Sequence, residues 1–152
     1  MPTLWRISNH DDLVGLGGEH TARWHTGEPG KRVVYLAEHP AVALLESFIH
    51  LKRPFVPATY QLLTVRVPDT LNIYHLDPST LPTDWKSRLD VTRAIGDPWL
   101  GSNAAALLGV PSAVAPESWN YLLNPKHPDW HTIAVIKSER HPYDQRLFTI
   151  ER

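Results

Sequence analysis

The sequence predicts one α+β domain that spans residues 1–152. A chain of 152 residues and 17.2 kDa suits one hydrophobic core rather than two. Hydrophobic residues make up 42% of the chain and charged residues 20%, a balance typical of a folded globular protein. Strand and helix patterns follow one another without the regular alternation of a parallel sheet, and this order favours the α+β class.

Strands are predicted where apolar residues alternate with polar ones or run continuously between turn residues. The predicted strands cover residues 3–7, 33–37, 59–67, 110–115, 120–124 and 132–137, with 146–150 as a last edge strand. Residues 11–18 and 21–31 are rich in glycine and polar residues, so they predict loops. Residues 78–90 predict a loop or short helix, and 128–131 a turn or short helix.

Two segments predict helices. Pro40 suits the first turn of a helix that runs to about Leu51. Its apolar face holds Ala41, Leu44, Leu45, Phe48, Ile49 and Leu51. This pattern predicts a largely buried helix with Glu46 at the edge of the core. Residues 92–109 predict a second helix, interrupted near Gly96-Asp97-Pro98, because glycine and proline both disfavour helix.

Composition excludes several classes of function. Fifteen Lys and Arg residues against sixteen Asp and Glu residues give a net charge of -1, which disfavours nucleic-acid binding by bulk charge. The absence of cysteine excludes disulfides, thiolate metal sites and a cysteine nucleophile. No apolar run reaches the roughly 18–20 residues that span a bilayer. No signal-peptide pattern opens the chain, so we expect a cytoplasmic protein that binds no membrane.

Familiar catalytic motifs are weak or missing. Gly15-Leu16-Gly17-Gly18 lacks the flanking strand and helix of a dinucleotide-binding loop, and no phosphate-binding P-loop motif occurs. His127 and His131 stand four residues apart, but Pro128 separates them and no HExxH motif exists, so we expect no metal. No GxSxG motif marks a serine nucleophile.

Four side chains have both a structural and a functional interpretation. Arg6, inside an apolar strand, points either to solvent or to an anion, and Arg23 in a turn is either exposed or bound to phosphate or carboxylate. Tyr35 either fills the core or offers a flat face to a ring. Glu46 is either solvated or faces a cleft. Together with the Ser112 hydroxyl, these groups suit a ligand with phosphates, a flat ring and a carbon that becomes cationic.

The order of several motifs resembles the RES domain, a family named after an Arg, a Glu and a Ser. The motifs are Leu4-Trp5-Arg6-Ile7, Ala22-Arg23-Trp24-His25, Val34-Tyr35-Leu36-Ala37-Glu38, Ala43-Leu44-Leu45-Glu46, Gly96-Asp97-Pro98-Trp99-Leu100, Val110-Pro111-Ser112-Ala113-Val114 and Asn120-Tyr121-Leu122-Leu123-Asn124-Pro125. The resemblance covers about residues 4–150. One departure is that Ala22 and His25 flank Arg23-Trp24 where the family pattern is similar to Gly-Arg-Trp-Asn.

The resemblance implies a fold like that of the ADP-ribosyltransferases, with a mixed, mostly antiparallel sheet. It also implies a bacterial toxin that uses NAD+ as its substrate and is silenced by an Xre-type antitoxin with a helix-turn-helix domain. The expected reaction breaks the nicotinamide–ribose bond, as a glycohydrolase or phosphorylase does. The resemblance leaves open whether the chain forms a homo-oligomer or a higher-order complex with the antitoxin.

The family's residues transfer to five positions. The Arg falls on Arg6 or Arg23, and both are expected to hold the diphosphate of NAD+. The Glu falls on Glu46, which is expected to stabilise the developing ribosyl cation. The Ser falls on Ser112, with Ser118 a less favoured match, and is expected to hydrogen-bond nicotinamide, ribose or Glu46. Tyr35 is expected to stack on nicotinamide.

Three other readings stay open. The first is a protein ADP-ribosyltransferase that uses the same cleft, and labelled protein would distinguish it. The second is a non-catalytic module that binds a nucleotide or a protein, which would release no nicotinamide. The third is a nuclease toxin, which the near-zero net charge and the lack of a basic tract disfavour.

Overall fold

A seven-stranded sheet organises the protein, in the order β4-β5-β6-β2-β1-β3-β7. The computed structural model describes residues 2–15, 22–51 and 56–149. Its strands are β1 (Thr3–Ile7), β2 (Val34–Ala37), β3 (Thr59–Arg66), β4 (Ile73–His75), β5 (Leu107–Pro111), β6 (Trp119–Leu123) and β7 (Ala134–Pro142). All neighbouring strands are antiparallel except β4 and β5, which run parallel. The predicted α+β class with a mixed, mostly antiparallel sheet is confirmed.

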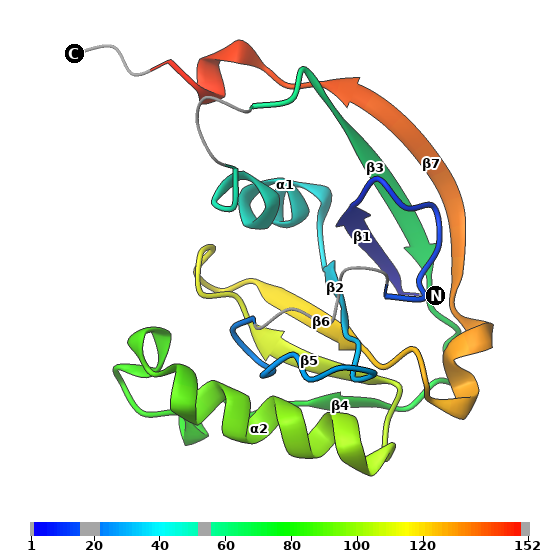
Figure 1. The fold of residues 1–152 in the computed structure, drawn as a ribbon, viewed down its shortest axis with the longest axis vertical. Coiled ribbons are helices and arrows are strands. Elements are labelled where there is room, and N and C mark those ends of the chain that lie inside the picture. The colour runs from blue at the N-terminus through cyan, green and yellow to red at the C-terminus, as the bar shows by residue number, and fades with distance from the viewer. Residues whose placement is uncertain (1, 16–21, 52–55, 150–152) are drawn as a thin grey trace.

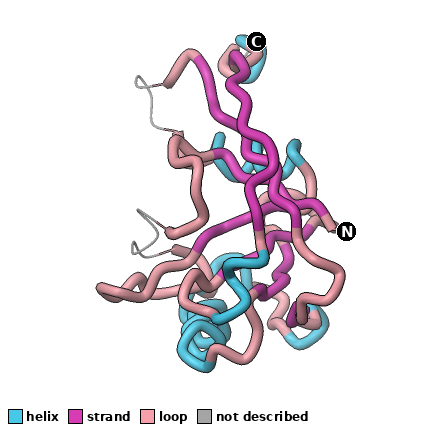
Figure 2. The backbone as a smooth tube through the Cα atoms, turned by 90° about the vertical axis from the view of Figure 1, so that its right-hand side faces the viewer, coloured by secondary structure: helices cyan, strands magenta, loops and turns pink. Residues whose placement is uncertain are grey.

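The sheet consists of two well-paired parts that meet at a narrow junction. β1 pairs with β3 over five positions and β2 pairs with β6 over four, but β1 and β2 share one pair, Trp5 opposite Ala37. β1, β3 and β7 form the upper part in Figure 1, and β2, β6, β5 and β4 form the lower part. The twisted sheet runs from β7 and the C-terminal end to α2 at the opposite end (Figures 1 and 2).

Both faces of β5, in the lower part of the sheet, are buried. Leu107 and Leu108 are adjacent in β5 and belong to two different core clusters, because successive strand residues point to opposite faces. Leu107 packs with Leu36 and Leu63, whereas Leu108 belongs to the cluster that contains Trp24 and Trp99. Continuous apolar strands of this kind need cover on both sides.

Helix α1 (Pro40–Phe48) begins where the sequence predicts, but its orientation differs from the prediction. His39 caps it by accepting a hydrogen bond from the Ala41 amide, and Pro40 occupies the first turn. Its buried residues are Val42 and Ala43, whereas Leu45 and Ile49 of the predicted apolar face are 42% and 52% exposed. The predicted burial of that face is therefore wrong. The helix ends at Phe48, three residues before the predicted end.

Helix α2 (Leu89–Ser102) runs through Gly96-Asp97-Pro98 without interruption, so the predicted break is wrong. It also starts three residues earlier than predicted and ends at Asn103, which adopts a left-handed conformation with a φ of 53°. The last residues of the predicted helix, 107–109, instead belong to β5. No helix among the described residues is long and apolar enough to cross a membrane.

Three contacts on one side of α2 explain why the helix continues. Thr92 Oγ1 donates to the Arg23 carbonyl at 2.5 Å, and Asp97 Oδ1 accepts from the Thr26 amide at 2.9 Å. Between them, a Cβ added at Gly96 would lie 1.6 Å from the Trp24 carbonyl oxygen. These residues therefore hold the segment at residues 23–26 against the helix, and Gly96 is required for its close approach rather than for a break.

The remaining strands follow the prediction with changes at their ends. β1 matches it, β2, β3 and β6 differ by a residue at one or both ends, and β5 lies earlier than predicted and ends at Pro111. β7 begins two residues later and extends to Pro142, and β4 was not predicted. The predicted strand at 146–150 is wrong, since Gln145–Leu147 is a short 3-10 helix; Ile150 lies outside the described residues, as do Leu16, Gly17 and Gly18.

We expect Gly96→Ala to destabilise the fold by about 2–4 kcal/mol, because its methyl group overlaps a backbone carbonyl. Gly101→Ala is the matched control on the same helix, where an added Cβ meets nothing within 4 Å. The control should stabilise the protein by up to about 1 kcal/mol through helix propensity. Urea denaturation of both variants measures the difference, and equal stabilities would contradict the close contact.

Candidate active site

A cavity of about 690 Å³ opens beside the junction of β1 and β2. It is lined by Trp5, Arg6, Ile7, Ala22, Arg23, Trp24, Tyr35, Leu36, Ala37, Ala43, Glu46, Ser47, Ile49, His50, Leu51, Leu89, Arg93, Ala113, Val114 and Asn120. These residues come from β1, β2, β6, α1 and the residues that follow it, the turn after β5, the start of α2 and the segment that α2 holds. A volume of this size is typical of a pocket for a small molecule.

Arg6 occupies the point where β1 and β2 separate. Beyond the pair Trp5–Ala37, the Arg6 Nη1 donates to the Tyr35 carbonyl at 3.0 Å. The guanidinium thus satisfies a carbonyl of the separating strand, since a partly buried carbonyl needs a donor. Burial lowers the pKa of Arg6 and the charge of Asp12 partly opposes this, but arginine starts so high that it remains a cation.

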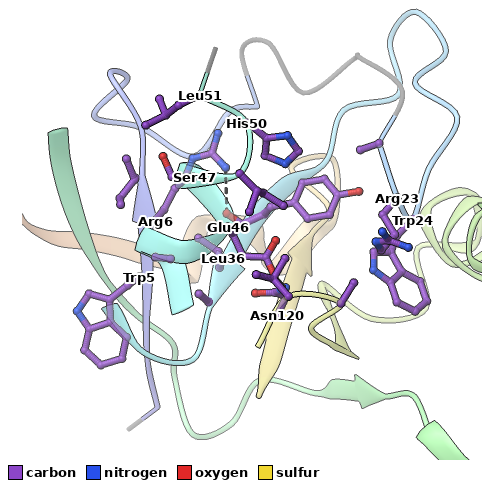
Figure 3. Close-up of a pocket in the computed structure, with 18 of the residues that line it drawn as sticks. Trp5, Arg6, Arg23, Trp24, Leu36, Glu46, Ser47, His50, Leu51 and Asn120 are labelled. Atoms are coloured by element: carbon purple, nitrogen blue, oxygen red, sulfur yellow. Dashed lines mark hydrogen bonds between the residues drawn. The ribbon is translucent and has the colours of Figure 1, made fainter. Parts of the chain in front are cut away.

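The Glu46 carboxylate is held by two neutral donors on one oxygen. Ser112 Oγ donates to Glu46 Oε1 at 2.7 Å, and Asn120 Nδ2 donates to the same oxygen at 2.8 Å. Within the described part of the chain, the second oxygen, Oε2, has no donor. Figure 3 shows Glu46 and Asn120 near the centre of the cavity. One oxygen fixes the carboxylate and the other remains for a ligand.

Ser112 has a fixed hydrogen-bond direction. Its Oγ accepts from the amides of Val114 and Ala115 at 3.1 and 3.0 Å, so its single proton is directed to Glu46. The residue is 4% exposed and follows directly after β5. Of the three predicted partners of Ser112, the structure places Glu46 in contact with it. Ser118 Oγ instead lies 3.5 Å from the Pro116 carbonyl, in the turn that follows.

Tyr35 is anchored by its hydroxyl. The hydroxyl lies 2.9 Å from Nδ1 of the buried His25, and the two rings are 5.8 Å apart. Burial raises the pKa of Tyr35, while the Trp24 backbone and the charges of Arg93 and Arg23 partly oppose the rise. The phenol therefore stays neutral at physiological pH, and the tyrosine contributes to the lining of the cavity as an uncharged aromatic group.

Arg23 lies on the side of the cavity away from Arg6, next to Trp24 (Figure 3). Its Nη1 donates to the Lys86 carbonyl at 2.7 Å, and its guanidinium lies over the Trp85 ring at 5.9 Å. Its own carbonyl is held by Thr92. The turn-rich segment is thus positioned by α2 and by the loop before it.

The structure brings together Arg6, Arg23, Tyr35 and Glu46 on one cavity and places Ser112 directly behind Glu46. Sequence reasoning missed two residues of the same site. Arg93 lies on a predicted helix with no local signal, and its Nε donates to the Ala22 carbonyl at 2.9 Å. Asn120 begins the NYLLN motif, but only the fold pairs it with a carboxylate 74 residues away.

His127 and His131, the two histidines four residues apart, each contact the backbone of a short 3-10 helix. His127 Nδ1 accepts from the Asp129 amide at 3.0 Å, and His131 Nδ1 lies 2.7 Å from the Pro128 carbonyl. Over residues 2–15, 22–51 and 56–149, no three His, Asp or Glu side chains gather at a spacing that suits a metal ion.

The family comparison agrees with the motif order. The RES domain model matches residues 3–145. The chain is 41% identical to "Toxin Res" of Pseudomonas putida, with 95% of this chain and 99% of that protein covered. It is 35% identical to "Prs ADP-ribosylating toxin" of a Sphingobium species, with 95% and 96% covered.

Solved structures share the fold. A chain of the M. tuberculosis MbcT–MbcA toxin–antitoxin complex superposes with a TM-score of 0.70, over 92% of this chain and 84% of that chain, at 16% identity. The sequence identity is low, so this likeness shows the fold. The family match and the close relatives show more: the chain belongs to the RES domain family.

Proposed function

We propose that this chain is the toxin of a toxin–antitoxin pair and that it consumes NAD+ by breaking the nicotinamide–ribose bond. The observation that carries the proposal is a single cavity lined by Arg6 and Arg23, which form no ion pair with a carboxylate of the described residues, and by a carboxylate that is fixed on one oxygen. The names of the relatives support it, because one is an ADP-ribosylating toxin and ADP-ribose is supplied to such reactions by NAD+.

The charges of the cavity favour an anionic ligand. Arg6 and Arg23 each donate to a backbone carbonyl, and neither forms an ion pair with a carboxylate of the described residues. The exposed Arg146, in contrast, pairs with Asp144 at 2.7 Å. Guanidinium groups that are oriented but not neutralised suit the oxygens of a diphosphate. We assign Arg6 and Arg23 to that diphosphate.

Glu46 would act on the sugar. Nicotinamide leaves NAD+ as a neutral ring, so the barrier lies in the oxocarbenium-like ribose rather than in the leaving group. A carboxylate beside that carbon, or bonded to the ribose hydroxyls, stabilises the transition state more than the ground state. Glu46 can do this through Oε2 while Ser112 and Asn120 hold Oε1. A partly enclosed site strengthens the effect, since less water screens the charge.

The other residues would position the substrate. The neutral ring of Tyr35 would lie against nicotinamide, with its hydroxyl fixed by His25. Ser112 would act through Glu46, because its proton is already donated to that carboxylate. The bond that breaks is between ribose C1′ and the nicotinamide nitrogen, whose electron pair leaves with the ring. C1′ then forms a bond to an acceptor.

A second candidate function differs in the acceptor alone. Water or phosphate as acceptor makes the chain an NAD+ glycohydrolase or phosphorylase, whereas a protein side chain makes it an ADP-ribosyltransferase. The relative named as an ADP-ribosylating toxin favours the second, at 35% identity. We propose NAD+ degradation first and protein modification second.

The proposed partner is a protein antitoxin of the Xre type. The structure that shares this fold was solved as a toxin–antitoxin complex. Apolar side chains beside the cavity, Leu45, Ile49 and Leu89, are between 39% and 52% exposed and suit contact with a protein. We propose a cytoplasmic site of action, since NAD+ and the antitoxin would both be present there.

We expect Glu46→Gln to lower the rate of nicotinamide release from NAD+ by about 10²–10³, because the neutral amide cannot stabilise the ribosyl cation. Glu38→Gln is the matched control, since Glu38 accepts from the Trp119 amide at 2.9 Å and does not line the cavity. Chromatography of released nicotinamide measures both rates. Near wild-type activity in Glu46→Gln would remove Glu46 from the mechanism.

Arg6→Lys and Arg23→Lys should each raise KM for NAD+ by about tenfold or more. Lysine keeps the charge but cannot hold a backbone carbonyl and a phosphate oxygen with one planar fork. Arg146→Lys, which alters an exposed arginine outside the cavity, should leave KM unchanged. Steady-state kinetics give KM and kcat separately, and full activity in both cavity variants would exclude the diphosphate role.

The acceptor can be read from the products. We expect free ADP-ribose, or its phosphate ester in phosphate buffer, when the protein is incubated with NAD+ and a cell lysate. Mass spectrometry of small molecules and of proteins in the same sample detects both outcomes. ADP-ribose attached to a discrete protein, with little free product, would establish the second candidate function. The Glu46→Gln variant controls for chemical breakdown of NAD+.

A further inference from the structure

Arg93 is a cation of the cavity that the proposed mechanism leaves without a role. It lies in the first half of α2, where its Nε donates to the Ala22 carbonyl at 2.9 Å, and it lines the same cavity as Arg6 and Arg23. The preceding residue, Thr92, holds the Arg23 carbonyl. Two successive residues of α2 therefore order the cations of the cavity. The Arg93 side chain is held by its own hydrogen bond to Ala22, and Thr92 holds the backbone of Arg23.

The charge of Arg93 is not neutralised within the described part of the chain. Its Nη1 and Nη2 bond to no described residue, and no described carboxylate forms an ion pair with it. Arg88, five residues earlier, shows the contrast, because its Nε and Nη2 donate to Asp90 at 3.0 Å each. Asp97 lies four residues after Arg93 on the same helix, and its two carboxylate oxygens accept hydrogen bonds from the Thr26 amide and the Thr26 hydroxyl.

Arg93 and Arg23 act on the same region of the cavity. The charges of both favour the ionised form of the Tyr35 hydroxyl, which burial opposes. Their backbone anchors, the carbonyls of Ala22 and Lys86, belong to the two segments that flank the start of α2. Arg6 approaches the cavity from β1, on the Glu46 side in Figure 3, whereas Arg23 lies at the opposite side.

We propose that Arg93 binds the diphosphate of the substrate together with Arg23 and is a specificity-determining residue for phosphate-bearing ligands. The proposal rests on the proposed function and adds a third cation to it. A guanidinium held by Nε keeps its two outer nitrogens, Nη1 and Nη2, and these can bind two phosphate oxygens together. With two guanidiniums on one side, the cavity favours a nucleotide with a diphosphate over the same nicotinamide ribose without phosphate.

The decisive comparison uses two substrates. Arg93→Gln should lower kcat/KM for NAD+ about 10- to 100-fold, mainly through KM, and leave the much slower release of nicotinamide from nicotinamide riboside unchanged. The riboside has no phosphate, so a residue that only supports the fold would lower both rates equally. Equal losses on the two substrates, or no loss on NAD+, would overturn the proposal.

A binding measurement keeps the test independent of turnover. Calorimetry with ADP-ribose should give a Kd about 10-fold or more weaker for Arg93→Gln than for wild type, with Arg93→Lys intermediate. Arg88→Gln removes an equal charge from the neighbouring surface and should bind like wild type. Unchanged ADP-ribose binding in Arg93→Gln refutes the role of Arg93. Binding that depends on Arg93 without nicotinamide release from NAD+ would instead refute the proposed reaction alone.

Discussion

The hydrogen bond from Arg6 to the Tyr35 carbonyl marks the feature on which the site depends. β1 and β2 pair at one position and then separate, and the open space between them becomes the cavity. A carbonyl that loses its strand partner in a partly buried place must find another donor. Arg6 supplies it at 3.0 Å, so one side chain both supports the separated strands and brings a fixed positive charge to the cavity.

The second side of the cavity depends on α2. Thr92, Gly96 and Asp97 hold the segment that carries Arg23 and Trp24 through backbone contacts, and Arg93 adds a fourth. These contacts hold the segment mainly through its backbone, and the Thr26 hydroxyl adds a side-chain contact with Asp97. The Arg23 side chain lines the cavity while its Nη1 donates to the Lys86 carbonyl, and the loop keeps a defined geometry although it has no regular structure.

The orientation of α1 joins the two sides through Glu46. The apolar residues Leu45 and Ile49 remain substantially exposed, while Glu46 turns inward to two donors, one directly after β5 and one in β6. Burying a carboxylate costs free energy unless it is hydrogen-bonded, and Ser112 and Asn120 provide those bonds. The helix thus leaves apolar side chains exposed and places an acidic group in a cavity that three arginines also line, an arrangement that points to function rather than to stability.

The α+β class, most strands, the start of α1 and the family could be predicted from the amino-acid sequence, because these depend on local patterns and on motif order. Arg6, Arg23, Tyr35, Glu46 and Ser112 were also candidates from the sequence. The folded structure was needed to show which face of α1 is buried, that α2 continues through Gly96-Asp97-Pro98, and that Arg93 and Asn120 line the cavity. Each of these depends on contacts between residues far apart in the chain, such as Gly96 with Trp24 and Asn120 with Glu46, and hydrophobic periodicity carries no record of such contacts.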